Sequence, residues 1–520
     1  MKRILTSFVC AALVITMMAG CTGKSVDAPV VTNTGDGTYF VTEEPVTLSI
    51  FCMDNNKPFD DEYPVFKRAA EFTNVSLHGI VAQSVSDKAQ VLNMMLSSGD
   101  IADIMHLYGR ESWFKYGTSG VIIPLNDLID EYAPNYKRFL EEHPDVKEYI
   151  TLSDGNIYNI PFVHDGDIAE TWFIRQDWLD TLSLTAPTTV DDFYNVMKAF
   201  RENDLNGNGA GNVVPYFNRK VGTDYEYSIS DLYVFFDAYK EWYVDDNGKV
   251  KYGSYEPELK TAMINIAKWY KEGLIDKEIY SRNNARDVLL ADNRGGITHD
   301  YVGSTAEFNT KLADKIPGFN FVPFLPPGGI ETSVREKLDQ NGWSISGKNK
   351  HPEITMKYFD FFFTEEGRRL MNYGVEGVHY TMVDGKPTFT DLVLNGEKPA
   401  IAMLQDAGAQ FTLGYHQDFD YERQWLNDIA LKGIDLYNEH AAFRTPFPNI
   451  QRNEEDEKLY KQIYVNVETL RNEMTQKWVL GSADIESTWE QYLRDLKDMN
   501  IEKMIEIQQS AYDKYIQNNR

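Results

Sequence analysis

Residues 172–215 read WFIRQDWLDTLSLTAPTTVDDFYNVMKAFRENDLNGNGAGNVVP and carry the clearest structural signals in the chain. Within it, residues 187–192 supply a helix N-cap and an acidic first turn, which favour the start of a helix. The residues that follow recur at helical spacing and form one apolar face, made of Phe193, Val196, Met197 and Phe200. The segment therefore predicts an amphipathic helix that packs against a core.

The same kind of pattern extends outward in both directions. Val46–Phe51 is the first strand-like apolar run, and helical stretches follow around residues 259–270 and 354–362. From Tyr464 to the end the pattern is almost wholly helical. Strand-like runs that alternate with amphipathic helices predict an α/β fold, here with a helical C-terminal region.

The composition is that of a folded protein with a strong negative charge. The 520 residues include 51 Lys and Arg against 79 Asp and Glu, a formal net charge of −28, and no basic run exceeds a pair such as Arg368-Arg369. A protein that neutralises phosphates needs clustered cations, so nucleic acid is excluded as a partner. With 42% hydrophobic residues the chain is not a disordered one, and its length suggests about two to four domains.

Residues 1–20 predict a signal peptide. Lys2 and Arg3 precede an apolar stretch, residues 4–18, that is too short to span a bilayer as a stable helix. The residues Met18-Ala19-Gly20-Cys21 resemble a bacterial lipobox, in which the cysteine becomes the lipid-modified first residue of the mature protein. A plain secretory signal followed by a chance cysteine is the alternative. Both interpretations export the chain, and lipid at Cys21 would anchor it on the extracytoplasmic face of the cell membrane.

Residues 21–43 predict a flexible tether that would let the folded part stand off the membrane, because they are rich in small and polar residues and lack helical periodicity. Cys52 would be the only cysteine left in the folded part, since Cys10 leaves with the signal peptide and Cys21 would carry lipid. An intrachain disulfide is then excluded, and Cys52 is expected to be a small buried apolar residue.

Motifs of catalysis are missing from the sequence. It contains no H-E-x-x-H, C-x-x-C or G-x-S-x-G motif and no phosphate loop ending in G-K-[ST]. Adjacent acids occur at Asp60-Asp61, Asp191-Asp192, Glu365-Glu366 and Glu454-Glu455. Their positions suit helix starts and solvated faces, whereas glycoside hydrolysis needs two carboxyl groups about 5–10 Å apart across a bond. The sequence thus predicts no enzyme, and an exported polysaccharide-degrading enzyme is the alternative.

Further motifs stand along the chain, namely LSSGD at residues 96–100 with Asp103-Ile104, Ile123-Pro124-Leu125, DGNIYNIP at 154–161, YGVEGVHY at 373–380 with DGKP at 384–387, and QSAY at 509–512. Together with residues 172–215 they resemble the large extracellular solute-binding lipoproteins that serve oligosaccharide ABC importers, the group that includes the alginate-binding proteins. The resemblance implies a two-lobed α/β clamp of the periplasmic-binding-protein type, which closes on a ligand and does not transform it.

The resemblance also implies a division of the chain. Lobe 1 is expected to comprise residues 44–160 and 300–347, and lobe 2 residues 161–299 and 348–520. The chain would cross between the lobes near residues 161–167 and again near residues 298–303, two polar stretches that contain glycine. Loops at these crossings are expected to line the cleft.

The loop DLNGNGA at residues 204–210 places oxygen atoms at alternate residues, as in the first half of an EF-hand loop. The candidate calcium ligands are Asp204, Asn206, Asn208, the carbonyl of Ala210, and Asn212. The family usually has an acidic pair where this chain has Asn212-Val213, so the charges that make calcium binding tight are missing. A glycine-rich Asx turn is the alternative. No cofactor is expected to be required, and a bound calcium ion would be structural.

A sugar ring offers apolar faces that stack on aromatic rings and hydroxyls that bond to carboxylates, amides and guanidinium groups. Candidate contacts are aromatic and polar residues that stand together near predicted strand ends: Asp54, Asn56, His106, Tyr108, Glu170, Trp172, His299, Asp300, Tyr301, His379 and Tyr380. Arg175 matches an arginine of the family and is either a ligand contact or an internal ion-pair partner. Each of the others could instead be an ordinary core or loop residue.

The negative charge of the chain would repel a polyuronate at long range, although screening within about 8 Å leaves the local charge of the cleft decisive. We therefore expect a neutral or mixed oligosaccharide as the ligand and the permease subunits of an ABC importer as partners. The chain is expected to act as a monomer. A surface glycan sensor or adhesin without a transporter is the remaining alternative.

Overall fold

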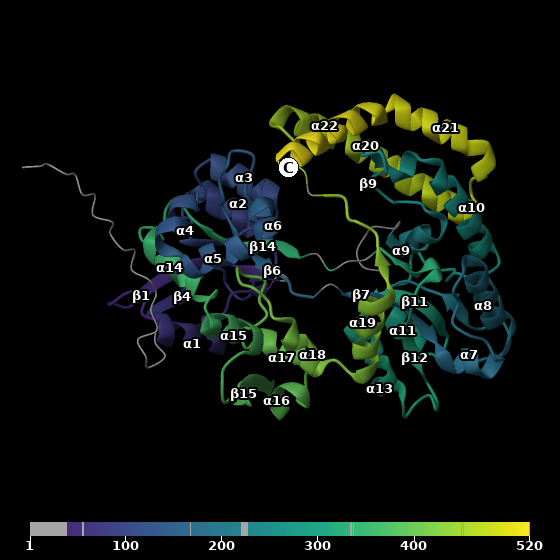
Figure 1. Cartoon of the computed structure of the whole chain (residues 1–520), viewed down its shortest axis with the longest axis horizontal. Coiled ribbons are helices and arrows are strands. Elements are labelled where there is room, and N and C mark those ends of the chain that lie inside the picture. The colour runs from purple at the N-terminus through teal and green to yellow at the C-terminus, as the bar shows by residue number, and fades with distance from the viewer. Residues whose placement is uncertain are drawn as a thin grey trace, which may run out of the picture.

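A computed structural model describes residues 39–54, 57–166, 168–219, 227–332, 335, 337–448, 450 and 452–518. The predicted signal peptide, Cys21 and the tether up to residue 38 lie outside the described residues, and so does Asn56. The described chain forms two α/β lobes, each with its own sheet and its own buried core (Figure 1). The predicted fold class is therefore confirmed.

The first lobe is built on a sheet with the strand order β4-β1-β5-β14-β6. β1 runs parallel to β4 and β5, whereas β14 runs antiparallel to β5 and β6. The strands are β1 (Val46–Phe51), β4 (Val75–Gly79), β5 (Ile104–His106), β6 (Ile160–Val163) and β14 (Leu338–Ile345). The helices that pack in this lobe include α1 (Pro64–Thr73), α3 (Arg110–Thr118), α4 (Asn126–Tyr132), α5 (Pro134–Glu142), α6 (Pro144–Ile150), α14 (Pro352–Phe361) and α15 (Glu365–Tyr373). The strand predicted at Val46–Phe51 is β1.

The second lobe is built on a sheet with the order β12-β7-β11-β8. Its strands are β7 (Glu170–Arg175), β8 (Val214–Tyr216), β11 (Gly295–Tyr301) and β12 (Phe321–Phe324). Trp172 and Ile174 of β7 point into one apolar cluster and Phe173 into another, so both faces of the sheet are covered. The covering helices include α7 (Gln176–Leu182), α8 (Val190–Glu202), α10 (Pro257–Lys271), α11 (Ala285–Ala291) and α19 (Asp428–His440).

Helix α8 is the helix predicted from residues 172–215. The Thr189 hydroxyl accepts a hydrogen bond from the Asp192 N–H at 3.1 Å, and the Asp192 carboxylate accepts one from the Thr189 N–H at 3.1 Å. Such a capping box satisfies two N–H groups that a helix start leaves unpaired, and the cap contributes about 1 kcal/mol. The predicted apolar face is buried at Phe193, Val196, Met197 and Phe200.

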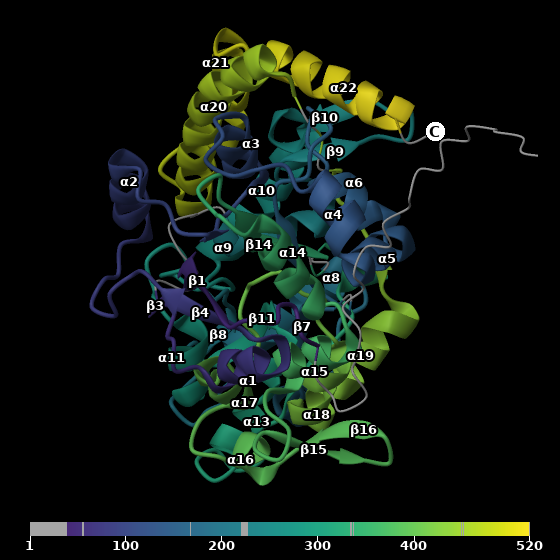
Figure 2. The same ribbon diagram turned by 90° about the vertical axis from the view of Figure 1, so that its left-hand side faces the viewer.

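The C-terminal region is helical, as predicted, and forms an arm made of α20 (Glu454–Leu480), α21 (Ile485–Asp498) and α22 (Ile501–Asn518). The arm packs on α10 and buries Trp478 and Tyr492 in the core of the second lobe. In Figures 1 and 2 it runs along one side of the molecule, from the second lobe towards the first. An ion pair of 2.5 Å between Lys461 and Glu111 joins α20 to α3. No helix in the described part of the chain is both long and apolar enough to span a bilayer.

Smaller elements connect these parts. The short strands are β2 (Met53–Asp54), β3 (Lys57–Pro58), β9 (Trp242–Val244), β10 (Val250–Tyr252), β13 (Ile330–Glu331), β15 (Tyr380–Val383), β16 (Lys386–Phe389) and β17 (Ala442–Phe443). The further helices are α2 (Lys88–Ser98), α9 (Tyr227–Ser230), η1 (Asp231–Phe236), η2 (Gly253–Tyr255), α12 (Val302–Ala306), α13 (Phe308–Leu312), η3 (Pro327–Gly329), α16 (Asp391–Leu394), α17 (Ala400–Asp406) and α18 (Phe419–Trp425).

The described chain passes between the lobes at three places: between β6 and β7, between β13 and β14, and around α18. The first crossing lies near the predicted residues 161–167. The prediction of a crossing near residues 298–303 is wrong, because β11 continues into α12, and Val302 and Ala306 are buried in the second lobe.

Two segments lie in a different lobe from the predicted one. The predicted ranges place residues 300–347 in lobe 1, whereas Phe321–Phe324 forms the edge strand β12 of the second sheet. They also place residues 348–520 in lobe 2, whereas Tyr358 of α14 and Leu370 of α15 are buried in the core of the first lobe. The third crossing explains the difference, since it returns the chain to the second lobe only near α18.

Candidate functional site

The carboxyl-terminal edges of the two sheets face each other. β6 runs parallel to β5, because β14 is antiparallel to both, so β6 ends at the edge where β1 and β5 also end. β7 enters the second sheet at Glu170, which pairs with Tyr301 at the carboxyl end of β11. The segment from Val163 to Glu170 can span no more than about 25 Å even when fully extended. Ligands of α/β sheets bind outside the carboxyl ends of strands, so these two edges form the candidate site.

The edge of the first lobe presents Asp54 and Tyr108. Asp54 follows β1 and accepts a hydrogen bond from the Thr412 hydroxyl at 2.7 Å. Burial raises the pKa of Asp54, while the bond from Thr412 and the nearby Lys88 ammonium act in the opposite direction. Tyr108 stands two residues beyond the end of β5, and 59% of it is exposed. An acceptor and an aromatic ring thus lie at this edge.

At the edge of the second lobe Tyr301 is exposed, whereas Glu170 and Asp300 beside it are buried. Tyr301 is 47% exposed, and the Arg219 guanidinium lies 5.5 Å from the centre of its ring. Asp300 is buried and forms ion pairs with Arg219 at 3.4 Å and with Arg286 at 3.2 Å. Arg219 was not predicted from the sequence, although its position three residues after the strand β8 offers a signal of the kind used for the other residues.

His299 and Trp172 belong to the interior of the second lobe. His299 lies 3.4 Å from the Asp231 carboxylate and 3.2 Å from that of Glu331, and its ring packs 5.2 Å from the Trp172 ring. Burial alone lowers the pKa of His299, but the carboxylates of Glu331 and Asp231 raise it by more, so this pKa lies well above 6.5. Trp172 is only 1% exposed. Both side chains therefore lie in the core beneath the sheet edge and do not line the candidate site.

His106 is likewise an interior residue. It is fully buried, its Nε2 lies 2.9 Å from the Thr412 carbonyl, and its Nδ1 lies 3.5 Å from Cys52 Sγ. Burial lowers the pKa of His106 to about 3, so its ring is neutral at neutral pH. Cys52 is buried, as predicted. The ring of His106 has both nitrogens engaged inside the lobe and offers no atom to a ligand.

Arg175 lies at the end of β7 opposite to Glu170 and is 1% exposed. Its guanidinium bonds to the Asp177 carboxylate at 2.8 and 2.6 Å and stacks over the Trp178 ring at 4.2 Å. Of the two roles considered for Arg175, the structure places it as an internal ion-pair partner. His379 and Tyr380 are also buried, away from both edges, where His379 Nδ1 accepts a hydrogen bond from the Val375 N–H at 3.0 Å.

Hydrogen bonds from Arg335 to Glu422 and Ile168 join the three crossings. The Arg335 guanidinium donates to both carboxylate oxygens of Glu422, at 2.7 and 3.0 Å, and to the Ile168 carbonyl at 3.3 Å. Its Cζ atom lies 5.4 Å from the centre of the Phe419 ring. That ring also packs on Gly166, where φ is +84° and an added Cβ would come within 2.8 Å of the ring. No local motif marks Arg335, Glu422 or Phe419, so the sequence did not predict that they would lie together.

The loop at residues 204–212 is closed by its own hydrogen bonds. Asn206 Oδ1 accepts from the Asn208 N–H at 3.1 Å, and Asn206 Nδ2 donates to Asn212 Oδ1 at 3.0 Å. Arg201 donates to the carbonyls of Gly211 and Val213. Asp204 is the only charged residue of the loop itself. Among the described residues no group of three His, Cys, Asp or Glu side chains could hold a metal ion, so any calcium here would rest on one carboxylate and neutral oxygens.

Three of the adjacent acid pairs lie at helix starts, as predicted. Asp192 caps α8, and the pairs Glu365-Glu366 and Glu454-Glu455 occupy the first turns of α15 and α20. Negative charge at these places stabilises the positive end of the helix dipole. In the fourth pair Asp61 accepts a hydrogen bond from the Gly79 N–H at 2.7 Å. These acids thus have structural roles.

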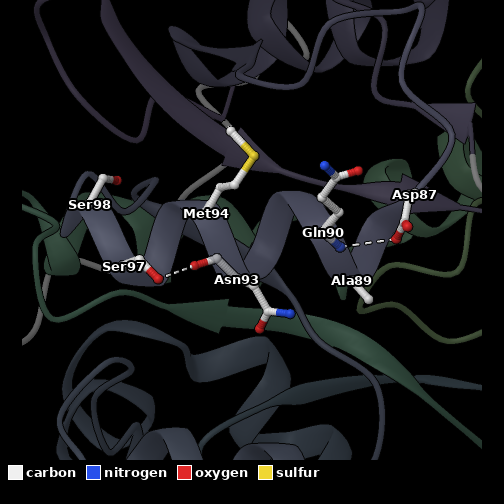
Figure 3. Close-up of a pocket in the computed structure, with 7 residues that line it drawn as sticks. All are labelled: Asp87, Ala89, Gln90, Asn93, Met94, Ser97 and Ser98. Carbon is white, nitrogen blue, oxygen red and sulfur yellow. Dashed lines mark hydrogen bonds between the residues drawn. The ribbon is translucent and has the colours of Figure 1, made fainter.

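A hollow of about 750 Å³ runs along the exposed helix α2 (Figure 3). In Figure 3 the Asp87 carboxylate accepts a hydrogen bond from the Gln90 N–H, and the Ser97 hydroxyl donates to the Asn93 carbonyl. The side chains that line the hollow are polar or aliphatic, so it lacks the aromatic platform that the two sheet edges have.

Comparison with known proteins gives a consistent picture. A family model described as bacterial extracellular solute-binding protein matches residues 62–369, more than half of the chain. The fructooligosaccharide ABC transporter substrate-binding protein FusA of Streptococcus pneumoniae serotype 4 is 25% identical over 509 residues, which cover 92% of each chain. Lipoprotein LipO of Bacillus subtilis (strain 168) is 24% identical over 429 residues, which cover 76% of this chain and 77% of LipO.

Among solved structures, that of the alginate-binding protein AlgQ2 without calcium ion is similar to this chain with a TM-score of 0.77 and 38% identity. The match covers 91% of this chain and 99% of AlgQ2. The similarity thus extends over both lobes and the C-terminal arm.

Proposed function

The chain belongs to the family of bacterial extracellular solute-binding proteins, and on that premise we propose that it captures an oligosaccharide between its lobes and hands it unchanged to an ABC importer. The names of its relatives support a carbohydrate ligand, since FusA is named for fructooligosaccharide and AlgQ2 for alginate. No step of chemistry is needed for this role. Closure on the ligand would let a permease distinguish the loaded from the empty form.

The observation that carries the proposal is the pair of exposed tyrosines on facing sheet edges. Tyr108 stands beyond β5 of the first lobe and Tyr301 at the end of β11 of the second. Two aromatic rings that approach from opposite lobes can hold a sugar ring by its apolar faces. Asp54, at the same edge as Tyr108 and partly exposed, would act as an acceptor for a sugar hydroxyl.

The charges at the two edges favour a neutral or mixed oligosaccharide. Arg219 and Arg286 share the carboxylate of Asp300, and Glu170 adds a second carboxylate at this edge. At the other edge Lys88 lies near the carboxylates of Asp54 and Asp339. A polyuronate would need cations that are not already balanced by protein carboxylates. Local charge therefore agrees with the repulsion expected from the net charge of −28.

We further propose that lipid on Cys21 anchors the protein on the outer face of the cell membrane, with the tether between the lipid and the first lobe. A relative named as a lipoprotein, LipO, supports this anchor. The permease subunits would be the partners, and the protein would act as a monomer. A single acyl chain binds membranes only weakly, so the anchor would need more than one chain for stable attachment.

For the loop at residues 204–212 we propose weak calcium binding with a structural role. Asp204, Asn206 and Asn208 would supply side-chain oxygens, and Ala210 and Asn212 would complete the set. One carboxylate makes a site of low affinity, about 10⁻⁴–10⁻³ M as in extracellular modules. Arg201 already holds the carbonyls of Gly211 and Val213, so the loop keeps its shape without the ion.

A thermal-shift screen tests the proposed function. Protein without the signal peptide and Cys21, residues 22–520, is mixed with neutral and acidic oligosaccharides, peptides and phosphorylated metabolites. A ligand at 100 times its dissociation constant adds about 2.7 kcal/mol of apparent stability. The proposal predicts that an oligosaccharide raises the melting temperature and is recovered intact. It is overturned if only peptides or phosphorylated metabolites do so, or if reducing ends are released from the glycans.

A further inference from the structure

A groove of about 620 Å³ lies between α3 of the first lobe and the start of the C-terminal arm. The wall on the first lobe includes Arg110, Phe114 and Leu152, and the wall on the arm includes Ile450 and Arg452. Pockets that hold ligands of moderate size have volumes of about 300–1,000 Å³. The groove therefore has room for several ring-sized units, and its two walls belong to different lobes.

The groove begins where the candidate site ends. Arg110 is the first residue of α3 and stands two residues after Tyr108, so the Cα atoms of the two are at most about 7 Å apart. At the other wall, Lys461 of the arm forms an ion pair of 2.5 Å with Glu111. The candidate site and the groove are thus adjacent at the start of α3.

The surface of the groove suits sugar units. Phe114, Leu152 and Ile450 give it apolar surface. The Arg110 guanidinium lies 4.9 Å from the Tyr149 ring, and that of Arg452 lies 3.7 Å from the Tyr460 ring, so both planar groups lie against aromatic faces. Stacked guanidinium groups are preorganised donors, and apolar surface with a few oriented polar groups is the chemistry that saccharides require.

Arg452 is also anchored from the side of the arm. It donates to Glu457 at 2.8 Å and to Gln508 at 2.6 Å. These bonds hold the guanidinium group in one orientation. A side chain fixed in this way loses less conformational freedom when a ligand binds. The wall on the arm therefore offers a guanidinium group that is already oriented.

We propose that this groove is an accessory subsite, which receives the distal units of an oligosaccharide whose first unit lies between Tyr108 and Tyr301. The inference rests on the proposed function and extends it to chain length. Longer oligosaccharides gain contacts in the groove and bind more tightly than short ones. Because the walls belong to different lobes, an oligosaccharide that fills the groove also holds the lobes together.

The experiment measures length selection directly. Immobilised wild-type protein is incubated with a pool of neutral and acidic oligosaccharides of two to eight units, and the retained chains are sized by mass spectrometry. Thr118→Trp fills the groove with a bulky ring, since Thr118 is exposed and lines it. Phe114→Ala removes apolar surface instead. Thr310→Trp, an exposed position on α13 of the second lobe, is the matched control.

Wild-type protein and Thr310→Trp should both retain mainly long chains. In Thr118→Trp and Phe114→Ala the retention of long chains should fall about tenfold, which corresponds to about 1.4 kcal/mol, while that of the shortest bound chains stays the same. Equal losses at all lengths, or no change in the length profile, would overturn the accessory subsite and leave the proposed function standing. If the wild type retains no glycan, both fail together.

Discussion

Arg335 and Glu422 form a bidentate ion pair, with distances of 2.7 and 3.0 Å, between two segments that each cross from one lobe to the other. The same guanidinium donates to the Ile168 carbonyl of the remaining crossing in the described chain. One side chain thus joins all three crossings. We expect any relative movement of the lobes to pivot near it, since the crossings are held together there.

Replacement of Arg335 by Met should lower the free energy of unfolding by about 2–4 kcal/mol, because it leaves the Glu422 carboxylate largely buried without its partner. The double variant Arg335→Met/Glu422→Met should recover most of that loss, since neither charge remains. Urea unfolding measures both. Arg423→Met, at an exposed position beside Glu422, should change stability by no more than about 0.5 kcal/mol. A double variant as unstable as the single one would contradict the pairing.

Replacement of Tyr108 or Tyr301 by Ala should weaken oligosaccharide binding at least about tenfold, because each ring supplies one side of the proposed sandwich. The melting temperature of the free protein should change little, since Tyr108 is 59% and Tyr301 47% exposed. Calorimetric titration with the glycan found in the screen checks the affinity. Tyr194→Ala, on α8 away from both edges, is the control. Unchanged affinity in both variants would place the ligand elsewhere.

Stability should fall on mild acidification because of His106. Its pKa is about 3 in the folded protein, as burial disfavours the charged ring, and about 6.5 when unfolded. At pH values between 3 and 6.5 the unfolded chain binds a proton at His106 that the folded protein does not bind. The contribution of His106 to the free energy of unfolding is therefore complete above pH 6.5 and is lost as the pH falls towards 3. Each unit by which the pH falls in this range lowers the free energy of unfolding by up to about 1.4 kcal/mol.

His106→Gln removes that proton, so its unfolding free energy should depend less steeply on pH between 6.5 and 4 than that of the wild type. Urea unfolding at several pH values gives both slopes. His351→Gln, at an exposed position, should keep the wild-type slope. Equal slopes for His106→Gln and the wild type would show that His106 takes up its proton in the folded protein as well.

Calcium at 5 mM should stabilise the protein by about 1 kcal/mol if its dissociation constant is about 1 mM. Magnesium should have a smaller effect, because it keeps its waters and demands octahedral geometry. Thermal melts with calcium, magnesium or a chelator measure the shift. Asp204→Asn should abolish it, whereas Asp246→Asn, in an exposed turn of the same lobe, should not. A calcium shift that survives Asp204→Asn would place the ion at another site.

Replacement of Cys21 by Ala should release the protein from the membrane fraction, because the acyl acceptor is gone. Cell fractionation with an immunoblot, and labelling with a fatty acid analogue, compare the variant with the wild type. Cys52→Ala provides the control, since Cys52 is buried and free. A wild-type protein that takes up no label and appears in the soluble fraction would support the plain secretory signal instead.

Features that depend on neighbours along the chain could be predicted from the amino-acid sequence. The capping residues and apolar spacing of residues 187–200 predicted α8, and the run Val46–Phe51 predicted β1. Its motifs also indicated the family. Helix starts and amphipathic faces are encoded within a few residues, so they can be recognised before the fold is known.

The tertiary structure decided which lobe each segment joins and which side chains reach the facing edges. Arg335 and Glu422 are 87 positions apart, and the third crossing near Glu422 moves residues 348–418 into the first lobe. Trp172 and His299 stand at the predicted strand ends, yet they point into the core, while Tyr301 beside them stays exposed. Burial and long-range pairing arise only when distant segments pack together, so no local pattern could have distinguished these neighbours.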